Sequence, residues 1–244
     1  MHRATLASLV IGASILALAA TAIFHKTVDK ISPRPKRVAF TVEQRLAQYG
    51  AGVAARLAPA FAQARVAYPP HDIAYIAFKD ERVLQVYARS KTGEPWRFVK
   101  AYQVLAASGN SGPKLREGDR QVPEGIYRAE LLNANSRFHL SIRLDYPNDF
   151  DRRMALMDQR ATLGGDIMIH GNQVSIGCLA MGDQAAEDLF ILSAQVGKEH
   201  TRIIVSPTDF RVRKAAPPQQ SPAWTGELYE QLRAELKQYP RQAL

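Results

Sequence analysis

Cysteine is nearly absent from this chain of 244 residues, in which Cys178 stands alone. A single thiol excludes a disulfide within the chain. The sequence also lacks CxxC and HExxH patterns, and one cysteine with one neighbouring histidine leaves a tetrahedral zinc site incomplete, so we expect no metal and no other cofactor. The formal net charge is +9. Basic and aromatic residues are not interleaved as in nucleic-acid-binding proteins, so we expect no nucleic-acid partner.

Charge is also missing near the start of the chain. No ionisable side chain occurs from Ala4 to Phe24, between Arg3 and His25. About 21 apolar residues suffice to span the ~30 Å hydrocarbon core of a bilayer. Residues 1–30 are therefore expected to form a cleaved signal peptide or a retained membrane anchor. Both forms place the remaining chain outside the cytoplasm, which we interpret as the periplasm, and a retained anchor would make the inner membrane a partner.

Composition divides the rest of the chain into four parts. Residues 31–40 are basic and contain two prolines, which indicates a linker. A helical segment is expected over residues 41–70 and a β-rich domain over residues 71–210. Residues 211–244 combine a Pro/Gln-rich linker with a C-terminal amphipathic helix.

The first helix of this scheme has a clear start. Thr41 and Gln44 form a capping-box pattern, and apolar residues follow at helical spacing. Gly50, Gly52 and Pro59 are expected to weaken or break this helix.

Two more helices are expected towards the C-terminus. Asp183 is predicted to cap the first of them. Leu228, Leu232 and Leu236 form the apolar stripe of the second. That stripe either packs on the domain or binds a partner.

Aromatic and β-branched residues dominate the runs between these helices, which is typical of strands. We predict mainly antiparallel strands and a mainly β fold with peripheral helices, built on a curved mixed β-sheet or sandwich. The predicted strands are Ile73–Phe78, Val83–Tyr87, Trp96–Val104, Gly125–Leu132, Arg137–Leu144, Gly165–His170 and Arg202–Ser206.

The surroundings of Cys178 suit a nucleophile. A hydrophobic run ends at His170, and a short polar loop leads to Ser175-Ile-Gly-Cys178. Only a thiolate attacks a carbonyl well, and an imidazole within hydrogen-bond reach would lower the thiol pKa and accept its proton. The alternative is an inert buried thiol, which is the commoner role of a lone cysteine.

Two polar loops are candidate walls of a binding cleft. The loop Ser108–Tyr127 is dense in glycine, proline and charge, and its Lys114 and Arg116 would face a ligand carboxylate. The segment Leu144–Arg153, which includes Tyr146, forms a lid or rim. Both segments have the alternative of being ordinary surface loops.

Three of these pieces together resemble a known family. They are Gly-Pro-Lys114 with Pro-Glu-Gly-Ile-Tyr127, then Ile-His170-Gly171, then Ser175-Ile-Gly-Cys178. Over about Ile73–Ser206 the order resembles the L,D-transpeptidase catalytic domain (YkuD) family of peptidoglycan enzymes, and its YafK-like branch in Gram-negative bacteria in particular.

The resemblance implies a role for each residue of the motif. Cys178 would attack a peptidoglycan stem peptide and form a thioester, with His170 as the base. The carbonyl of Gly171 would orient the imidazole. Backbone N–H groups of Ile176, Gly177 and Cys178 would form an oxyanion hole, and Ser175 would shape the loop.

The sequence departs from the usual family pattern beside the thiol. Ile176 stands where a second histidine is common, and Ala180 replaces an arginine. Loss of that arginine removes a bidentate carboxylate contact. Substrate binding would then fall to other side chains, for which the candidates are Lys114, Arg116, Arg143 and Tyr146.

Three functions follow from these observations. The first is transpeptidation in cell-wall biogenesis or remodelling, with stem peptides as substrate. The second is hydrolysis of the same acyl-enzyme by an endopeptidase or amidase that releases an envelope lipoprotein or a peptide. The third is non-catalytic binding to peptidoglycan, with an inert thiol.

Overall fold

The computed structural model describes residues 39–242. The expected targeting segment over residues 1–30 and nearly all of the expected linker over 31–40 lie outside these described residues. From residue 39 to residue 242, no helix is long and apolar enough to cross a membrane.

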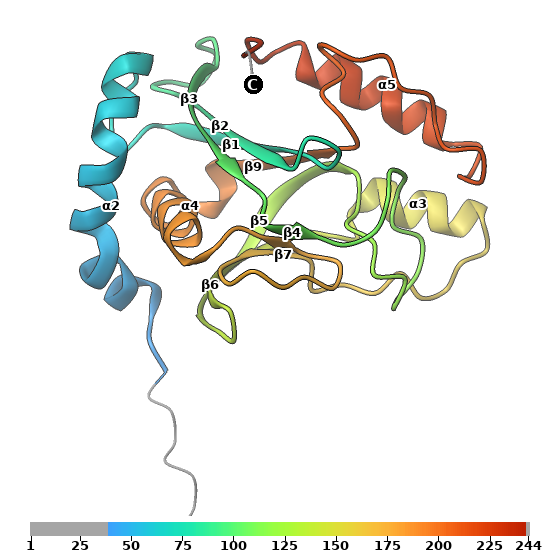
Figure 1. The fold of residues 1–244 in the computed structure, drawn as a ribbon, viewed down its shortest axis with the longest axis horizontal. Helices are drawn as coiled ribbons and strands as arrows, with labels where there is room; N and C mark the ends of the chain where they lie inside the picture. Colours follow the sequence, from blue (N-terminus) through green and yellow to red (C-terminus); the bar gives the residue numbers. More distant parts are fainter. Residues whose placement is uncertain (1–38, 243–244) are drawn as a thin grey trace, which may run out of the picture. The chain divides into compact units, whose positions relative to one another are not determined.

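The described chain is built on one mixed sheet of nine strands in the order β3-β2-β1-β9-β5-β6-β7-β8-β4 (Figure 1). The pairs β1/β9 and β7/β8 are parallel, and the other neighbours are antiparallel. This curled sheet with few helices confirms the predicted fold class. The strands are β1 Asp72–Phe78, β2 Val83–Arg89, β3 Arg97–Gln103, β4 Ala106–Ala107, β5 Gly125–Ser136, β6 His139–Leu144, β7 Met168–His170, β8 Leu179–Ala180 and β9 Thr201–Ser206.

Strand β1 shows why the sheet is buried on both faces. Successive side chains of a strand point to opposite faces. Ile73, Tyr75 and Ala77 therefore join one apolar core with α2 (Val42–Ala64) and α4 (Asp183–Val196). The alternate residues of the strand join a second core with α5 (Thr225–Leu236).

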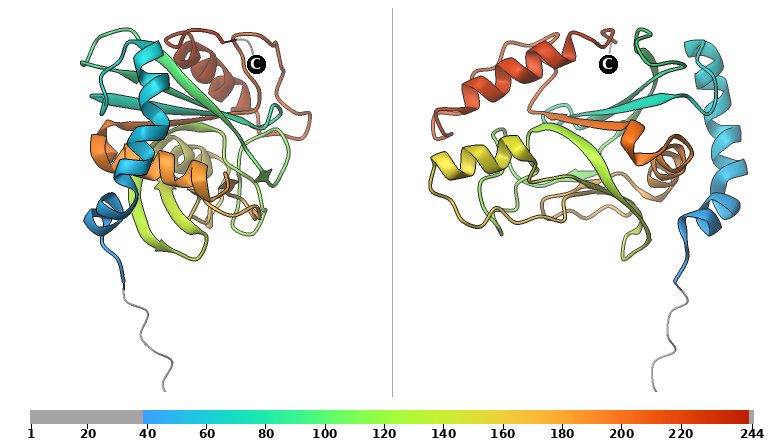
Figure 2. Two further views of the ribbon diagram at one scale, coloured as in Figure 1. Left: turned by 60° about the vertical axis from the view of Figure 1, so that its left-hand side comes forward. Right: turned by 180° about the vertical axis from the view of Figure 1, so that it is seen from behind.

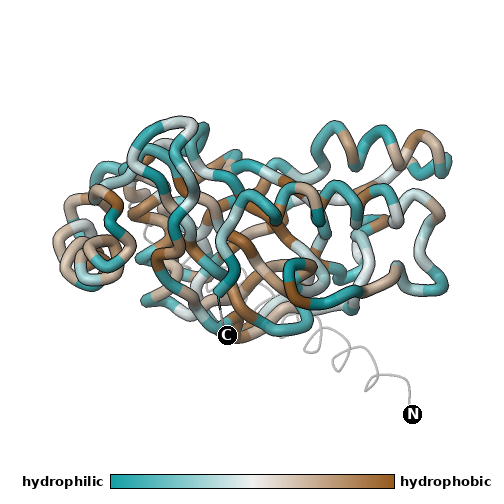
Figure 3. The backbone as a smooth tube through the Cα atoms, turned by 90° about the horizontal axis from the view of Figure 1, so that it is seen from above, coloured by the Kyte–Doolittle hydropathy of each residue, from teal (hydrophilic) through white to brown (hydrophobic). Residues whose placement is uncertain are grey.

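The helices form two groups on opposite sides of the sheet. Helices α2 and α4 lie together on one side, and α5 and α3 (Asp149–Met157) on the other (Figure 2). Hydrophobic stretches of the backbone are concentrated in the strands, and the connecting loops are mainly hydrophilic (Figure 3). A single-turn 3-10 helix, η1 (Lys198–His200), leads from α4 into β9.

Helix α2 corrects one prediction. The capping box at Thr41 and Gln44 is present, but the helix runs unbroken through Pro59. Its apolar stripe is buried at Val53, Leu57 and Phe61. Packing of such a stripe outweighs the local cost of proline, about 3 kcal/mol in a helix interior.

One further prediction is corrected by a helix start. The N-cap of α4 is Gly182, and Asp183 is already the first helical residue. The predicted lid or rim continues into α3, which Asn148 caps with its side chain. A role of this segment as lid or rim stays a prediction.

The C-terminal helix packs on the domain. Leu228, Leu232 and Leu236 of α5 are at most 3 % exposed and lie in the second core. Tyr239, just beyond the helix, stacks on Trp96 with ring centroids 5.2 Å apart. The apolar stripe is therefore covered by the chain itself.

Candidate active site

Two short parallel strands bring the backbones of His170 and Cys178 close together. Strand β7 ends at His170, and its register pairs Ile169 with Leu179 and His170 with Ala180 of β8. Cys178 directly precedes β8. Paired residues of neighbouring strands point to the same face, and residues two apart share a face. If this register continued to Cys178, the thiol would project to the same side as the imidazole.

The His170 imidazole is buried and oriented. It is 2 % exposed, and its Nδ1–H donates to the Gly171 carbonyl oxygen at 2.5 Å. The Phe138 ring covers it at a centroid distance of 4.8 Å. Burial lowers the pKa of His170, although the hydrogen bond to Gly171 works against that shift. A neutral ring with a protonated Nδ1 leaves Nε2 as a proton acceptor.

The turn after His170 admits only glycine at position 171. A Cβ on Gly171 would lie 2.5 Å from Asp183 Oδ1 and 2.8 Å from the Phe138 carbonyl oxygen. Asp183 occupies this space because its Oδ1 accepts the Asn172 N–H at 2.8 Å. The carbonyl that orients His170 is thus held between α4 and the β5–β6 hairpin.

The Cys178 thiol is half-buried and protonated. Its Sγ lies 3.7 Å from the Asp166 carbonyl oxygen, to which it donates a weak hydrogen bond. Burial raises the pKa of Cys178, and the Asp166 carboxylate adds to that rise. The sequence suggested a lowered thiol pKa, and in this conformation the shift has the opposite sign.

Serine hydroxyls organise the cysteine loop. Ser175 Oγ accepts the Cys178 N–H at 3.0 Å and donates to the Cys178 carbonyl at 2.6 Å. The Gly177 N–H donates to Ser108 Oγ at 2.5 Å, and Ser108 donates to the Arg120 carbonyl at 2.7 Å. Two of the three predicted oxyanion donors therefore already have a partner in this conformation.

Gly177 and Ile176 differ sharply in their surroundings. Gly177 has a φ of 94°, in the left-handed region that favours glycine. The Ile176 side chain next to it is 78 % exposed. The residue in place of a family histidine thus projects into solvent beside the thiol.

The predicted cation Lys114 is buried and paired. Its ammonium donates to Asp119 Oδ1 at 2.5 Å and to the Arg116 carbonyl at 2.9 Å. Asp119 also accepts backbone N–H groups of the same loop. Lys114 therefore holds the loop together, whereas the Arg116 side chain is exposed. A role for either residue in binding substrate stays a prediction.

Arg143 and Tyr146 occupy different environments. Arg143 on β6 pairs with Met168 and forms ion pairs with Glu130 at 3.0 Å and Asp166 at 3.2 Å. It therefore lies beside the backbone that contacts the thiol. Tyr146 is 4 % exposed, and its hydroxyl donates to carbonyl groups of two loops. The structure thus places Tyr146 in the core.

A cavity of about 720 Å³ lies next to the cysteine loop. Arg116, Gln121 and Arg160 line it, together with the C-terminal arm around Pro218. The Gln121 carbonyl oxygen is 3.6 Å from the position of a Cβ on Gly177. Neither reactive side chain lines this cavity, so it adjoins the candidate site without containing it.

The sequence did not reveal four residues that position this site. Phe138, Ser108, Asp166 and Asp183 each contact the histidine, its turn or the cysteine loop. Asp183 and Asp166 are close in sequence to the segment from His170 to Cys178. Their polar side chains next to this segment were the signal from which their role could have been inferred. Ser108 is 69 residues from Gly177, a separation that no local pattern covers.

Comparison with known proteins gives a family match over residues 73–226, to the model described as YkuD, the L,D-transpeptidase catalytic domain. A curated relative from Escherichia coli K12, "Putative L,D-transpeptidase YafK", is 38% identical over 115 residues. That match covers 46% of this chain and 44% of the relative. The chain thus spans less than half the length of this relative.

Solved structures with similar folds come from three bacteria. The cell shape determining protein Pgp2 of Campylobacter jejuni has 19% identity and a TM-score of 0.45, covering 61% of this chain and 50% of that chain. Bd1075 of Bdellovibrio bacteriovorus has 19% identity and a TM-score of 0.41, covering 70% and 56%. L,D-transpeptidase 1 of Mycobacterium tuberculosis has 16% identity and a TM-score of 0.32, covering 55% and 62%.

The family match covers more than half of the chain and includes His170, Cys178 and the loop from Ser108. On this match the chain belongs to the L,D-transpeptidase catalytic domain (YkuD) family.

Proposed function

We propose that this protein is a cysteine acyltransferase that acts on the stem peptides of peptidoglycan in the periplasm. The observation that carries the proposal is the pairing of β7, which ends at His170, with β8, which Cys178 directly precedes, together with the imidazole Nδ1–H bond to the Gly171 carbonyl. Membership of the family supports the substrate class. Cys178 is the proposed nucleophile and His170 the proposed base.

The first half-reaction forms a thioester. His170 Nε2 takes the thiol proton as Cys178 Sγ attacks the carbonyl carbon of the stem-peptide bond before its terminal D-residue. The tetrahedral intermediate collapses, the C–N bond breaks, and the imidazolium returns the proton to the leaving amine. A neutral base with a lowered pKa and a protonated thiol are the starting forms that this general-base route needs.

The second half-reaction depends on the acceptor. An amine attacks the thioester carbon and restores the thiol in transpeptidation, with the imidazole taking the amine proton. Water does the same in hydrolysis and leaves a shortened stem. Family membership supports amine transfer, so we place the protein in cell-wall remodelling.

The reaction needs a change at the thiol. Sγ points to the Asp166 carbonyl in this conformation, so the side chain must rotate towards the imidazole when substrate binds. The Ser108 hydroxyl must likewise release the Gly177 N–H if this donor is to stabilise the oxyanion. Catalytic contacts often tighten only in the substrate complex.

Product analysis of a purified disaccharide-tetrapeptide tests the proposal. We expect the chain to make cross-linked dimers or peptide–lipoprotein products with an amine acceptor, and we expect Cys178→Ala to make none. A thioester adduct should be seen by intact mass spectrometry in the unmodified chain alone. Turnover that survives Cys178→Ala would refute the cysteine mechanism.

Hydrolysis is the second candidate function. Ile176 and Ala180 replace the histidine and the arginine that are usual in the family, so the acceptor side of this site differs. Released stem peptides or lipoprotein fragments, with no dimers at any amine concentration, would support an endopeptidase or amidase. If sacculus binding occurs with neither product and no thioester, the protein is a non-catalytic binding module.

A further inference from the structure

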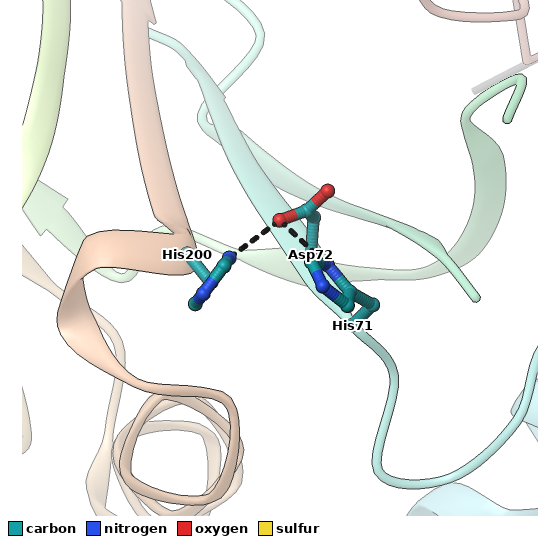
Figure 4. Close-up of side chains that lie close together, drawn as sticks. All are labelled: His71, Asp72 and His200. Carbon is teal, nitrogen blue, oxygen red and sulfur yellow. Dashed lines mark hydrogen bonds and ion pairs between the residues drawn. The ribbon is translucent and has the colours of Figure 1, made fainter. Parts of the chain in front are cut away.

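A second group of chemically active side chains lies away from the candidate active site. His71, Asp72 and His200 meet where β1 begins and η1 ends (Figure 4). One potential ligand atom from each residue lies within 4.8 Å of those of the other two. Among residues 39–242, this is the one group of three or more His, Cys, Asp or Glu side chains that meets this criterion. It is four strands from β7 in the sheet order.

The three side chains converge on one carboxylate oxygen. Asp72 Oδ1 lies 2.8 Å from His200 Nδ1 and 3.1 Å from His71 Nδ1. The two imidazole rings meet edge to face, with centroids 4.7 Å apart. Figure 4 shows both rings on the same side of the carboxylate. Both Nδ1 atoms therefore face the same carboxylate oxygen.

The two nitrogen–oxygen separations are close to those between neighbouring ligands of a first-row metal ion, and the ligand atoms of the two rings lie within 4.8 Å of each other. Donors about 2.0–2.1 Å from zinc lie roughly 2.9 Å apart at right angles and about 3.4 Å apart in a tetrahedron. The observed 2.8 and 3.1 Å fall at the right-angle end of this range. Two imidazoles and one carboxylate form the donor set that suits zinc and its neighbours.

The surroundings of Asp72 fix its orientation. Arg89 Nε binds the second oxygen, Oδ2, at 2.7 Å. The first oxygen, Oδ1, is thereby directed to the two rings. Outer partners of this kind are typical of metal ligands.

The position is open to solvent on one side. The side chains of His71 and His200 are 43% and 39% exposed, against 10% for Asp72. A cavity of about 280 Å³ is lined by Asp72, His200 and a further carboxylate, Glu199. An ion there has access from solution and room for water as additional ligands.

Positive charge in the same cavity sets a limit on the affinity. Arg89, Arg128 and Arg202 also line it. Arg89 is paired with Asp72, and Arg202 with Glu235, so these two charges are largely neutralised. The positive charge of Arg128 repels a cation. We therefore expect a dissociation constant in the micromolar range, weaker than that of a closed structural metal site.

From this geometry we propose that His71, Asp72 and His200 form a zinc-class metal site with three protein ligands. The ion takes the lone pairs of both Nδ1 atoms, and each neutral ring carries its proton on Nε2. It joins the start of β1 to the turn before β9, which are 128 residues apart along the chain. Because only the folded chain brings the ligands together, the ion stabilises the native state.

The site is tested by zinc binding to the full chain, purified without a histidine tag. The chain carries Cys178→Ser, so that its thiol cannot bind zinc. We expect calorimetry with zinc chloride to give one equivalent bound and a raised unfolding temperature. His200→Gln and His71→Gln should each weaken binding at least tenfold, since even loss of an outer-shell partner costs about 10–100-fold.

The matched control is His139→Gln. His139 also binds a carboxylate, at 3.0 Å from Glu187, but has no second histidine. This variant should bind zinc as the parent does. Zinc binding that is absent, or that persists equally in His71→Gln and His200→Gln, would overturn the proposal and leave the cluster as a hydrogen-bonded link.

A measurement without variants guards against misfolding. Backbone amide signals of residues 71–72 and 199–201 should shift in NMR spectra of the Cys178→Ser chain when zinc is added. Shifts confined to other residues would overturn the assignment of the ligands.

Discussion

The two halves of the candidate active site are prepared to different degrees. His170 ends a strand, is 2 % exposed and has its Nδ1–H on the Gly171 carbonyl. Cys178 follows a loop and is half-buried, and its thiol donates to the backbone carbonyl oxygen of Asp166. The proposed base is oriented by strand and turn, whereas the proposed nucleophile and its neighbouring N–H groups are held in other contacts.

This difference shows where flexibility is needed. A base must offer Nε2 as a free acceptor at the start of the reaction, and the Nδ1–H bond to the Gly171 carbonyl fixes that tautomer. A nucleophile must approach a substrate carbonyl and then release it, and loops supply such movement more easily than strands. We therefore expect changes on the His170 side to affect activity more than changes to the serine contacts of the cysteine loop.

The largest effect is expected for His170→Gln. Loss of the base should lower kcat about 10³-fold, within the range typical of general acid–base catalysis. The measurement is turnover of the disaccharide-tetrapeptide, and circular dichroism checks that the variant is folded. His139→Gln serves as control, because its ring pairs with Glu187 and should leave kcat unchanged. A loss below about tenfold would contradict the assignment of the base.

Gly171→Ala should have the next largest effect. A Cβ would overlap Asp183 Oδ1 and the Phe138 carbonyl, so the turn must shift and carry the orienting carbonyl with it. A misplacement of about 1 Å can cost roughly 10²-fold in rate. The measurement is kcat.

Gly165→Ala is the matched control for that change. Gly165 lies just before β7, and the nearest atom to its added Cβ is 3.9 Å away. We expect near-normal turnover. If both glycine variants lose activity equally, the turn at Gly171 has no special part in orienting the base.

The same contrast explains how much of the site could be predicted from sequence. The histidine half consists of neighbours in the chain, His170 and Gly171, so a local motif contained it. The cysteine half depends on Ser108, which approaches from a distant loop. The sequence also gave no sign that Asp119 would pair with Lys114 and that this charge would be buried.

The fold followed a similar rule. Strands β1 and β2 have strong apolar and aromatic runs, and their predicted bounds differ from the observed ones by one or two residues. Strand β7 is only Met168–His170. It starts later than predicted because its ladder with β6 covers only Met168 to His170. Order along the sheet depends on contacts between distant segments, which no local pattern records.

A smaller effect is expected for the serine contacts. Ser175→Ala loses both bonds to the Cys178 backbone, and we expect kcat to fall about tenfold, the equivalent of roughly 1.4 kcal/mol. Ser108→Ala loses one bond to the cysteine loop and frees the Gly177 N–H, so its effect should be smaller. Ser111→Ala, whose hydroxyl binds Asp80 in the same loop region, is the control. An order reversed between Ser108 and Ser175 would contradict this account.

The smallest expected effect is on the pH dependence of activity. It distinguishes a neutral imidazole–thiol pair from a thiolate–imidazolium pair at His170 and Cys178. Burial lowers the pKa of His170 from its ordinary 6.5 and raises that of Cys178 above its ordinary 9.0. The base works only when neutral, so kcat/KM should fall as the pH drops through a midpoint below 6.5. It should not rise again near pH 8.5, because the thiol remains protonated there.

A thiolate–imidazolium pair would behave differently: its thiolate would react with iodoacetamide well below pH 6. Alkylation rates of the parent chain and of His170→Gln, measured across this range, decide between the two. If the variant reacts only as the pH rises towards 9 and beyond, while the parent follows the acid limb of kcat/KM, the histidine acts as a neutral base and the nucleophile is activated only during the reaction.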